Sequence, residues 1–226
     1  MPRRIRVLRV QHNFVEPTNH AFLDELARFP DLEAHALCPY WGIESGNMRR
    51  LAGSPRADLT VARTLFTRRY DTTIYIEKFG GMIRRLRPDI FSIHEEPWSL
   101  AMGQALALRR AFAPRARLVF VSAQNIVKKY PFPFSAIEAA TFRAASAGYG
   151  CSEGVREAVR VKGFAGPFPI MALGLNPDLY RYRARGGADA AGRAFVFGFA
   201  GRLVEEKGVF TLLRAFALVR GDARLV

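Results

Sequence analysis

Apolar and polar positions along the chain form blocks of two kinds, which predict strands and helices in alternation. Short apolar runs, typical of buried strands, lie at 5–11, 32–37, 58–62, 89–93, 118–122 and 195–197. Apolar residues recur every three or four positions, as in a helix with one buried face, over 21–29, 70–86, 98–112, 137–145, 152–161 and 206–220. This alternation favours an α/β fold with a Rossmann-like, doubly wound parallel sheet.

The same pattern divides the chain into two predicted domains. Residues 1–176 contain all but the last of the apolar runs and are expected to form a Rossmann-like domain. Residues 177–194 are rich in Gly, Ala and Arg and are interpreted as an interdomain linker. Residues 195–226 hold one strand, one helix and the start of another strand, whereas a doubly wound domain needs on the order of 100 to 150 residues. We therefore expect an incomplete second Rossmann-like domain, in a truncated reading frame or a fragment.

The charge of the chain is strongly positive. Lys and Arg total 34 against 20 Asp and Glu, which gives a net charge of +14. Such a balance favours anionic partners such as nucleotide-sugars, acidic lipid surfaces or nucleic acid. Because the basic residues are scattered and match no nucleic-acid motif, no nucleic acid is expected as a partner. Basic residues spread over solvated faces are an equally good interpretation.

Cysteines and apolar runs bear on the compartment. Cys38 and Cys151 lie far apart and match no metal-ligand spacing, so we predict a reducing cytoplasm and no metal. No apolar run approaches the roughly 18 residues that a membrane-spanning helix needs. The basic stretch 70–86 is interpreted either as a core helix with a solvated face or as a surface for peripheral contact with an acidic membrane.

The most informative motif is GFAGRLVEEKGVFTLLRAFALV, which begins at Gly198. Gly198 and Gly201 keep a turn free of side chains before a helix whose N-terminus would favour an anion. This motif resembles the donor site of the retaining glycosyltransferases of family GT4, which have the two-domain GT-B fold. The resemblance implies that Arg202, Lys207 and Gly201 bind the diphosphate of a nucleotide-sugar. The alternative is an ordinary strand-turn-helix unit with solvated charges.

A second motif, RPDIFSIHEEPW, places His94 at the carboxyl end of a buried strand, where ligands of open α/β sheets bind. It is similar to the family pattern D-x-x-H-x-H-E-P, with Ser92 in place of the first His and a second Glu before Pro97. The resemblance implies that His94 is catalytic and lies near the anomeric centre of the sugar. A structural histidine is the alternative.

Other candidates lie in loops on the cleft side of the first domain. His12, Asn13 and His20 follow the first strand, in a loop that lacks the Gly-Gly pair of many family members. Gln124 and Asn125 follow the 118–122 strand, and Ser152 ends a short predicted strand and caps the next helix. The resemblance makes these residues candidates for contacts with the acceptor, whereas solvated polar loops are the alternative.

The expected function is transfer of a sugar from a nucleotide-diphosphate-sugar donor to a carbohydrate, lipid or small-molecule acceptor, with retention. The nucleotide-sugar is a substrate, and no cofactor is implied. The family's E-x7-E segment is missing from residues 1–226, so we expect little or no activity from the truncated chain. The alternative is a non-catalytic Rossmann-like binding module, or a fragment that needs a partner chain.

Overall fold

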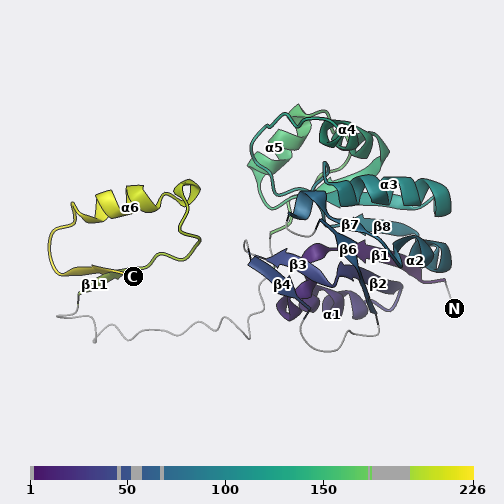
Figure 1. Cartoon of the computed structure of the whole chain (residues 1–226), viewed down its shortest axis with the longest axis horizontal. Helices are drawn as coiled ribbons and strands as arrows, with labels where there is room; N and C mark the ends of the chain where they lie inside the picture. The colour runs from purple at the N-terminus through teal and green to yellow at the C-terminus, as the bar shows by residue number, and fades with distance from the viewer. Residues whose placement is uncertain (1–2, 45–46, 52–57, 67–68, 173, 175–193) are drawn as a thin grey trace. The chain divides into compact units, whose positions relative to one another are not determined.

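A computed structural model describes residues 3–44, 47–51, 58–66, 69–172, 174 and 194–226 (Figure 1). The chain divides into two compact units, Met1–Gly174 and Leu175–Val226. The predicted linker, 177–194, lies outside the described residues except for Ala194.

A six-stranded parallel sheet is the centre of the first unit. Its strands are β1 (Ile5–Val10), β2 (Leu32–Pro39), β5 (Leu59–Ala62), β8 (Ile90–Ile93), β9 (Arg117–Val121) and β10 (Ala145–Tyr149). They lie in the order β10-β9-β8-β1-β2-β5. Numbered along the chain within this sheet, the order is 3-2-1-4-5-6, that of a Rossmann fold. The predicted α/β, doubly wound parallel sheet is therefore confirmed.

The helices of the first unit match four of the predicted segments closely. They are α1 (Ala21–Ala27), α2 (Phe79–Leu86), α3 (Leu100–Phe112), α4 (Phe134–Ala144) and α5 (Glu153–Val161), and short 3-10 turns lie at His12–Val15, Pro17–His20 and Tyr70–Thr72. Ser99 caps α3 by accepting from the Met102 N–H, and Ser152 caps α5 by accepting from the Val155 N–H. These caps satisfy N–H groups that have no partner within the helix.

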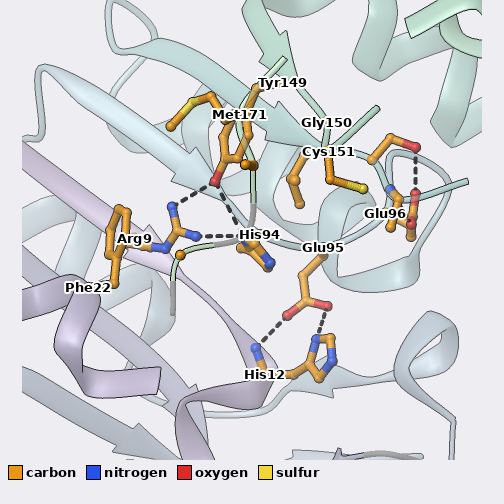
Figure 2. A pocket seen from close by; sticks show the side chains of 15 residues that line it. Arg9, His12, Phe22, His94, Glu95, Glu96, Tyr149, Gly150, Cys151 and Met171 are labelled. Atoms are coloured by element: carbon orange, nitrogen blue, oxygen red, sulfur yellow. Dashed lines mark hydrogen bonds and ion pairs between the residues drawn. The ribbon is translucent and has the colours of Figure 1, made fainter. Parts of the chain in front are cut away.

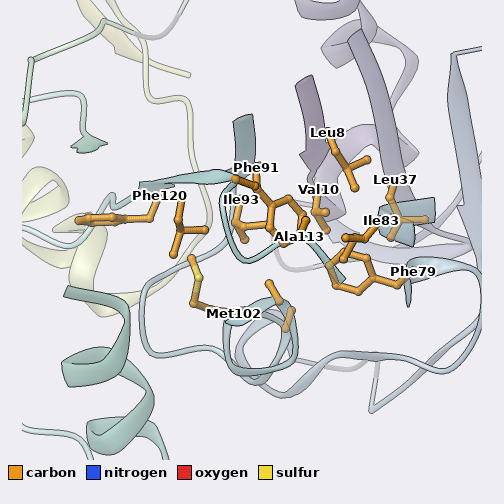
Figure 3. Packing of buried hydrophobic residues seen from close by; sticks show 14 of the residues in the cluster. Leu8, Val10, Leu37, Phe79, Ile83, Phe91, Ile93, Met102, Ala113 and Phe120 are labelled. Atoms are coloured by element: carbon orange, nitrogen blue, oxygen red, sulfur yellow. The ribbon is translucent and has the colours of Figure 1, made fainter. Parts of the chain in front are cut away.

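Both faces of the sheet are buried. Leu37 of β2 belongs to the larger core cluster, which includes Phe79 of α2, Phe91 of β8 and Met102 of α3 (Figure 3). Its neighbours Ala36 and Cys38 point to the opposite face, where they pack with Phe14, Leu23 and Leu59. Successive side chains of a strand point to opposite faces, so a strand apolar at every position needs cover on both sides.

The prediction of one helix over 70–86 is wrong in its first half. Tyr70–Thr72 form a 3-10 turn and β7 (Ile74–Tyr75) is a short strand, so α2 begins only at Phe79. The side chain of Gln104 accepts from the Tyr75 N–H at 2.9 Å and donates to the Tyr75 carbonyl at 2.6 Å, which holds Tyr75 extended.

Helix α2 also decides between the two interpretations of the basic stretch. Its apolar side chains Phe79, Met82, Ile83 and Leu86 are all buried in the unit. Arg84 and Arg85 are exposed on the other face. The core-packed interpretation of this helix is confirmed, and no apolar face of α2 is left for a membrane. None of the described helices is long and apolar enough to cross one.

Two antiparallel pairs beside the parallel sheet were not predicted. One pairs β3 (Trp41–Glu44) with β4 (Asn47–Arg50), and the other pairs β6 (Thr64–Leu65) with β7. Both are short and lack the long apolar runs that identify the central strands.

The second unit contains a two-stranded parallel sheet and one helix. The strands are β11 (Phe195–Phe197) and β12 (Ala223–Leu225), and the helix is α6 (Val209–Phe216). The predicted helix over 206–220 is too long at both ends. It begins late because Glu205–Lys207 form a 3-10 turn and Gly208 has a φ of +70°, and it ends at Phe216. Within this unit no residue of α6 is buried, although Phe216 contacts Phe197 with ring centroids 5.8 Å apart.

Candidate functional site

The strand order reverses between β1 and β8, and the chain places a histidine at the carboxyl end of each. His12 lies two residues after β1, and His94 directly follows β8. The two strands pair in parallel, with Val10 opposite Ile93. In open α/β sheets this reversal leaves a crevice at the carboxyl ends of the strands, where ligands bind.

A cavity of about 450 Å³ opens at this edge of the first unit (Figure 2). Its wall comes from the ends of β1, β8, β9 and β10, from α1 and from the segment that follows Ile170. The lining residues are Arg9, His12, Phe22, His94, Glu95, Glu96, Val121, Ser122, Ala123, Tyr149, Gly150, Cys151, Met171, Ala172 and Gly174. This volume falls within the range of small-molecule sites.

Glu95 holds His12 through two hydrogen bonds. One carboxylate oxygen accepts from the His12 backbone N–H at 2.8 Å, and the other accepts from Nδ1 of the ring at 2.6 Å. The Glu95 side chain is almost fully buried. Since a carboxylate only accepts, Nδ1 of His12 carries a proton, and the ring has a fixed orientation at the end of β1.

The hydrogen bond to His94 runs in the opposite direction, because Nδ1 of this ring accepts from Arg9. The Arg9 guanidinium donates from Nη2 to Nδ1 of His94 at 2.5 Å, and the Tyr149 hydroxyl lies 3.3 Å from the same nitrogen. Because Arg9 has no acceptor, Nδ1 of His94 is unprotonated and the ring proton lies on Nε2. Burial lowers the pKa of His94 to about 3, and the charges of Arg9 and His12 act in the same direction. His94 is therefore a neutral ring at physiological pH.

Arg9 is a buried cation inside the sheet. It is 4% exposed and donates to Gln11 at 2.5 Å, Ser92 at 3.2 Å and Tyr149 at 3.0 Å, in addition to His94. The Phe22 ring covers one face of the guanidinium, with its centroid 4.0 Å from the central carbon. Burial lowers the pKa of Arg9, although the pKa of an arginine stays high enough to keep it charged.

Glu96 is the second carboxyl group of the cavity wall. It accepts from the Ser122 hydroxyl at 2.9 Å and from the Ala123 N–H at 2.9 Å, which ties the end of β8 to the end of β9. Burial raises the pKa of Glu96 to about 7, helped by the charge of Glu95 and opposed by the two hydrogen bonds. A carboxyl group with such a pKa exchanges protons near neutral pH.

Of the predicted first-domain candidates, only His12 and His94 line this cavity. Asn13 accepts a hydrogen bond from Gln11, and its carbonyl accepts from Asn19. His20 contacts the Phe14 carbonyl at 2.8 Å through Nε2. Gln124 accepts from the Ile126 N–H, Ser152 caps α5, and Asn125 lies against Gly154. These side chains organise loops around the cavity without forming its wall.

The predicted donor residues belong to the second unit. Arg202 and Lys207 are exposed, and Lys207 ends the 3-10 turn before Gly208. Gly201 is also exposed, and a Cβ there would meet only the Phe199 ring, at 3.4 Å. The turn is therefore open on the surface of its unit.

Several lining residues were missed by the sequence analysis. Arg9 is one of two arginines in the strand IRVLRV, and nothing in the sequence distinguishes it from Arg6 as the buried one. Glu95 and Glu96 were noted only as a departure from a motif, and Tyr149 had no signal of its own. Within the described residues, no group of three or more His, Cys, Asp or Glu is placed to hold a metal ion, and Cys38 and Cys151 are free thiols.

Comparisons with known proteins give a structural similarity only. No family model and no curated protein matches the chain. A solved UDP-N-acetylglucosamine 2-epimerase has a TM-score of 0.59 and 12% identity, over 99% of this chain and 63% of that one. Anabaena HepE, solved with UDP and glucose, has a TM-score of 0.57 and 14% identity, over 98% of this chain and 60% of that one. A Listeria monocytogenes protein assigned as a UDP-N-acetylglucosamine 2-epimerase has a TM-score of 0.53 and 14% identity, over 98% of this chain and 61% of that one.

These similarities show the fold. The chain spans about three-fifths of the length of each of the three solved structures. At 12% to 14% identity they support a GT-B-like architecture and do not assign an activity to this chain.

Proposed function

We propose that the chain belongs to a glycosyltransferase that moves a sugar from a nucleotide-diphosphate-sugar to an acceptor with retention. The observation that carries the proposal is the cavity at the point where the strand order reverses, with His94 in its wall. Two further facts support it. The fold is similar to that of proteins named for a UDP-sugar or solved with UDP and glucose, and residues 198–219 resemble the GT4 donor motif.

In this proposal the first unit binds the acceptor and the reacting end of the sugar. His94 is neutral with its proton on Nε2, so it acts as a hydrogen-bond donor to a sugar or acceptor oxygen rather than as a base. A donor fixed in place before the reaction stabilises charge on that oxygen without having to reorient.

The second unit holds the leaving group. Breaking the bond between the sugar and the diphosphate leaves negative charge on the phosphate oxygens, and the cations Arg202 and Lys207 stabilise it. The nucleotide-sugar is a substrate here, and these two side chains neutralise the diphosphate without a cofactor. The free thiols of Cys38 and Cys151 fit a reducing compartment, and we place the protein in the cytoplasm.

A second candidate, epimerisation of a nucleotide-sugar, is favoured by one specific observation. Glu96 lines the cavity with a pKa raised to about 7, and inversion of a carbon by proton exchange requires a group that removes or returns a proton. A non-catalytic binding module is the third possibility, in which the cavity retains a ligand unchanged.

One experiment separates the three functions. A version of the chain joined to a matching second domain is incubated in D₂O with a panel of nucleoside-diphosphate sugars and small acceptors, and proton NMR follows the sugar. Transfer with retention releases nucleoside diphosphate and keeps the anomeric configuration of the donor in the product. Epimerisation introduces deuterium at the inverted carbon, and a binding module gives saturation transfer from protein to ligand without product. A panel in which no nucleoside-diphosphate sugar binds would refute the proposal.

A further inference from the structure

Arg9 is a buried charge without a carboxylate among its hydrogen-bond partners in the described part of the chain. It is 4% exposed, and the groups that accept from it are the neutral side chains of Gln11, Ser92, Tyr149 and His94. Burial of a charge is costly unless an opposite charge accompanies it. A cation placed in a cavity wall at this cost calls for a functional explanation.

The two carboxylates of the same cavity are engaged by other donors. Both oxygens of Glu95 accept from His12, one from the backbone and one from the ring. The oxygens of Glu96 accept from Ser122 and Ala123. The charge of Glu95 acts on Arg9 through space and raises its pKa, but burial outweighs this effect. A close counter-ion for Arg9 would therefore come from a ligand.

The surroundings of Arg9 also favour an anion. A guanidinium has five N–H groups, and the hydrogen bonds to described residues account for four of them. His94, next to Arg9 in Figure 2, has its proton on Nε2. Helix α5 begins two residues after Cys151, which lines the cavity, and the N-terminus of a helix carries partial positive charge.

We propose that the cavity binds its ligand through an anionic group, a phosphate or a carboxylate, that lies against Arg9 and beside His94. The anion supplies the negative charge that is missing beside Arg9. It also accepts hydrogen bonds from donors on one side of the cavity. A volume of about 450 Å³ accommodates a sugar-sized molecule with such a group. The identification of this ligand as the acceptor rests on the proposed function, which assigns the donor diphosphate to Arg202 and Lys207.

Binding of four probes tests the proposal: inorganic phosphate, glucose 6-phosphate, glucuronate and glucose. Calorimetry at constant ionic strength measures affinity, and NMR follows the ring signals of His94. We expect at least one of the anionic sugars to bind about tenfold or more tightly than glucose and to shift the His94 signals. Glucose 6-phosphate and glucuronate distinguish a phosphate ligand from a carboxylate ligand.

Three variants locate the anion. Arg9→Gln is expected to weaken anion binding about ten- to hundredfold, and Arg9→Lys is expected to keep part of it. Arg117→Gln is the matched control, because Arg117 is an exposed arginine at the opposite end of the strands, in a surface hollow with Arg3 and Arg4. It should bind the anions as the wild type does. If Arg9→Gln does not fold, the anion affinity of Arg9→Lys and the shift of the His94 signals in the wild type still test the proposal.

The proposal fails if neither anionic sugar exceeds glucose in affinity, if the anions leave the His94 signals unchanged, or if Arg117→Gln weakens binding as much as Arg9→Gln. Its failure is distinguishable from that of the proposed function. Sugar transfer without anion binding in the cavity would overturn this inference alone. Anion binding at Arg9 in a chain that uses no nucleoside-diphosphate sugar would overturn the proposed function and leave the anion site standing.

Discussion

His12 and His94 follow neighbouring strands of the sheet and carry their ring protons on opposite nitrogens. His12 donates from Nδ1 to Glu95, whereas His94 accepts at Nδ1 from Arg9. When both rings are neutral, Nε2 therefore carries the lone pair in His12 and the proton in His94. The carboxyl ends of β1 and β8 thus carry two imidazole rings in opposite tautomers.

We predict that His94 stays neutral far below the usual range of histidine. Its pKa is lowered to about 3 in the folded chain, against 6.5 without the fold. Between these values the unfolded chain binds a proton that the folded chain does not, so stability is complete above pH 6.5 and is lost as the pH falls. Between pH 6.5 and 4, His94→Gln should lose less stability than the wild type, by on the order of 2 to 3 kcal/mol. Chemical denaturation measures this, and a His94 ring signal that titrates near pH 6.5 would contradict it.

Glu96 should produce a pH dependence of the opposite sign. Its pKa is raised from 4.5 to about 7, so the folded chain holds a proton that the unfolded chain has released between these values. The corresponding stability is present below pH 4.5 and is lost as the pH rises towards 7. Glu96→Gln keeps a neutral side chain and should remove this loss, on the order of 1 to 3 kcal/mol. Identical pH profiles for wild type and Glu96→Gln would show that Glu96 is ionised throughout this range.

Glu95 is predicted to fix the tautomer of His12. In Glu95→Gln the amide can accept from only one of the two His12 donors, so a buried partner is left unsatisfied, at a cost of about 1 to 3 kcal/mol. Glu33→Gln is the control, because Glu33 forms a more exposed pair with His35 in β2 and should lose less than about 1 kcal/mol. Urea unfolding measures both changes, and nitrogen-15 shifts of His12 report the proton on Nδ1. Equal losses in the two variants would contradict the prediction.

The central fold was predictable because its signals are local. Apolar runs that need cover on both faces identify the parallel strands, and Ser152 marks a helix start through its own side chain. The prediction failed where a distant residue decides the local structure. Gln104 binds both backbone groups of Tyr75 across 29 positions and keeps it from continuing a helix, an effect that no local pattern contains.

The residues of the candidate site were predictable only where a titratable side chain follows a buried strand. His94 and His12 follow buried strands, and this position indicated them. Arg9 and Tyr149 lie 140 positions apart and meet because β1, β8, β9 and β10 are neighbours in the sheet. Their hydrogen bond follows from the strand order, which the alternation of strands and helices does not specify.

Packing against β10 gives a prediction independent of function. A Cβ on Gly148 would lie 2.5 Å from the Phe120 ring and 2.9 Å from Phe168. Gly148→Ala should therefore destabilise the first unit by about 1 to 3 kcal/mol, the usual cost of overpacking. Gly81→Ala is the matched control, because Gly81 lies in α2 with nothing within 4 Å of its Cβ position, and it should stabilise by roughly 0.5 to 1 kcal/mol. Thermal unfolding of both variants is the measurement, and a neutral Gly148→Ala would mean that Phe120 can move aside.

Arg202 and Lys207 are predicted to bind the diphosphate of the donor. Replacing either with Ala removes a charge-assisted contact of roughly 1.5 to 3 kcal/mol, which corresponds to about a ten- to hundredfold loss in affinity for nucleoside diphosphate. Glu205→Ala is the control from the same 3-10 turn, and because its exposed carboxylate would repel rather than bind a diphosphate, it should not weaken binding. Because Arg202, Glu205 and Lys207 are all exposed, none of the three changes is expected to disturb the packing of this unit. Titration of nucleoside diphosphate into wild type and each variant, made in a version of the chain completed with a matching second domain, measures the effect. Unchanged affinity in both Arg202→Ala and Lys207→Ala would remove the donor-site interpretation of this motif.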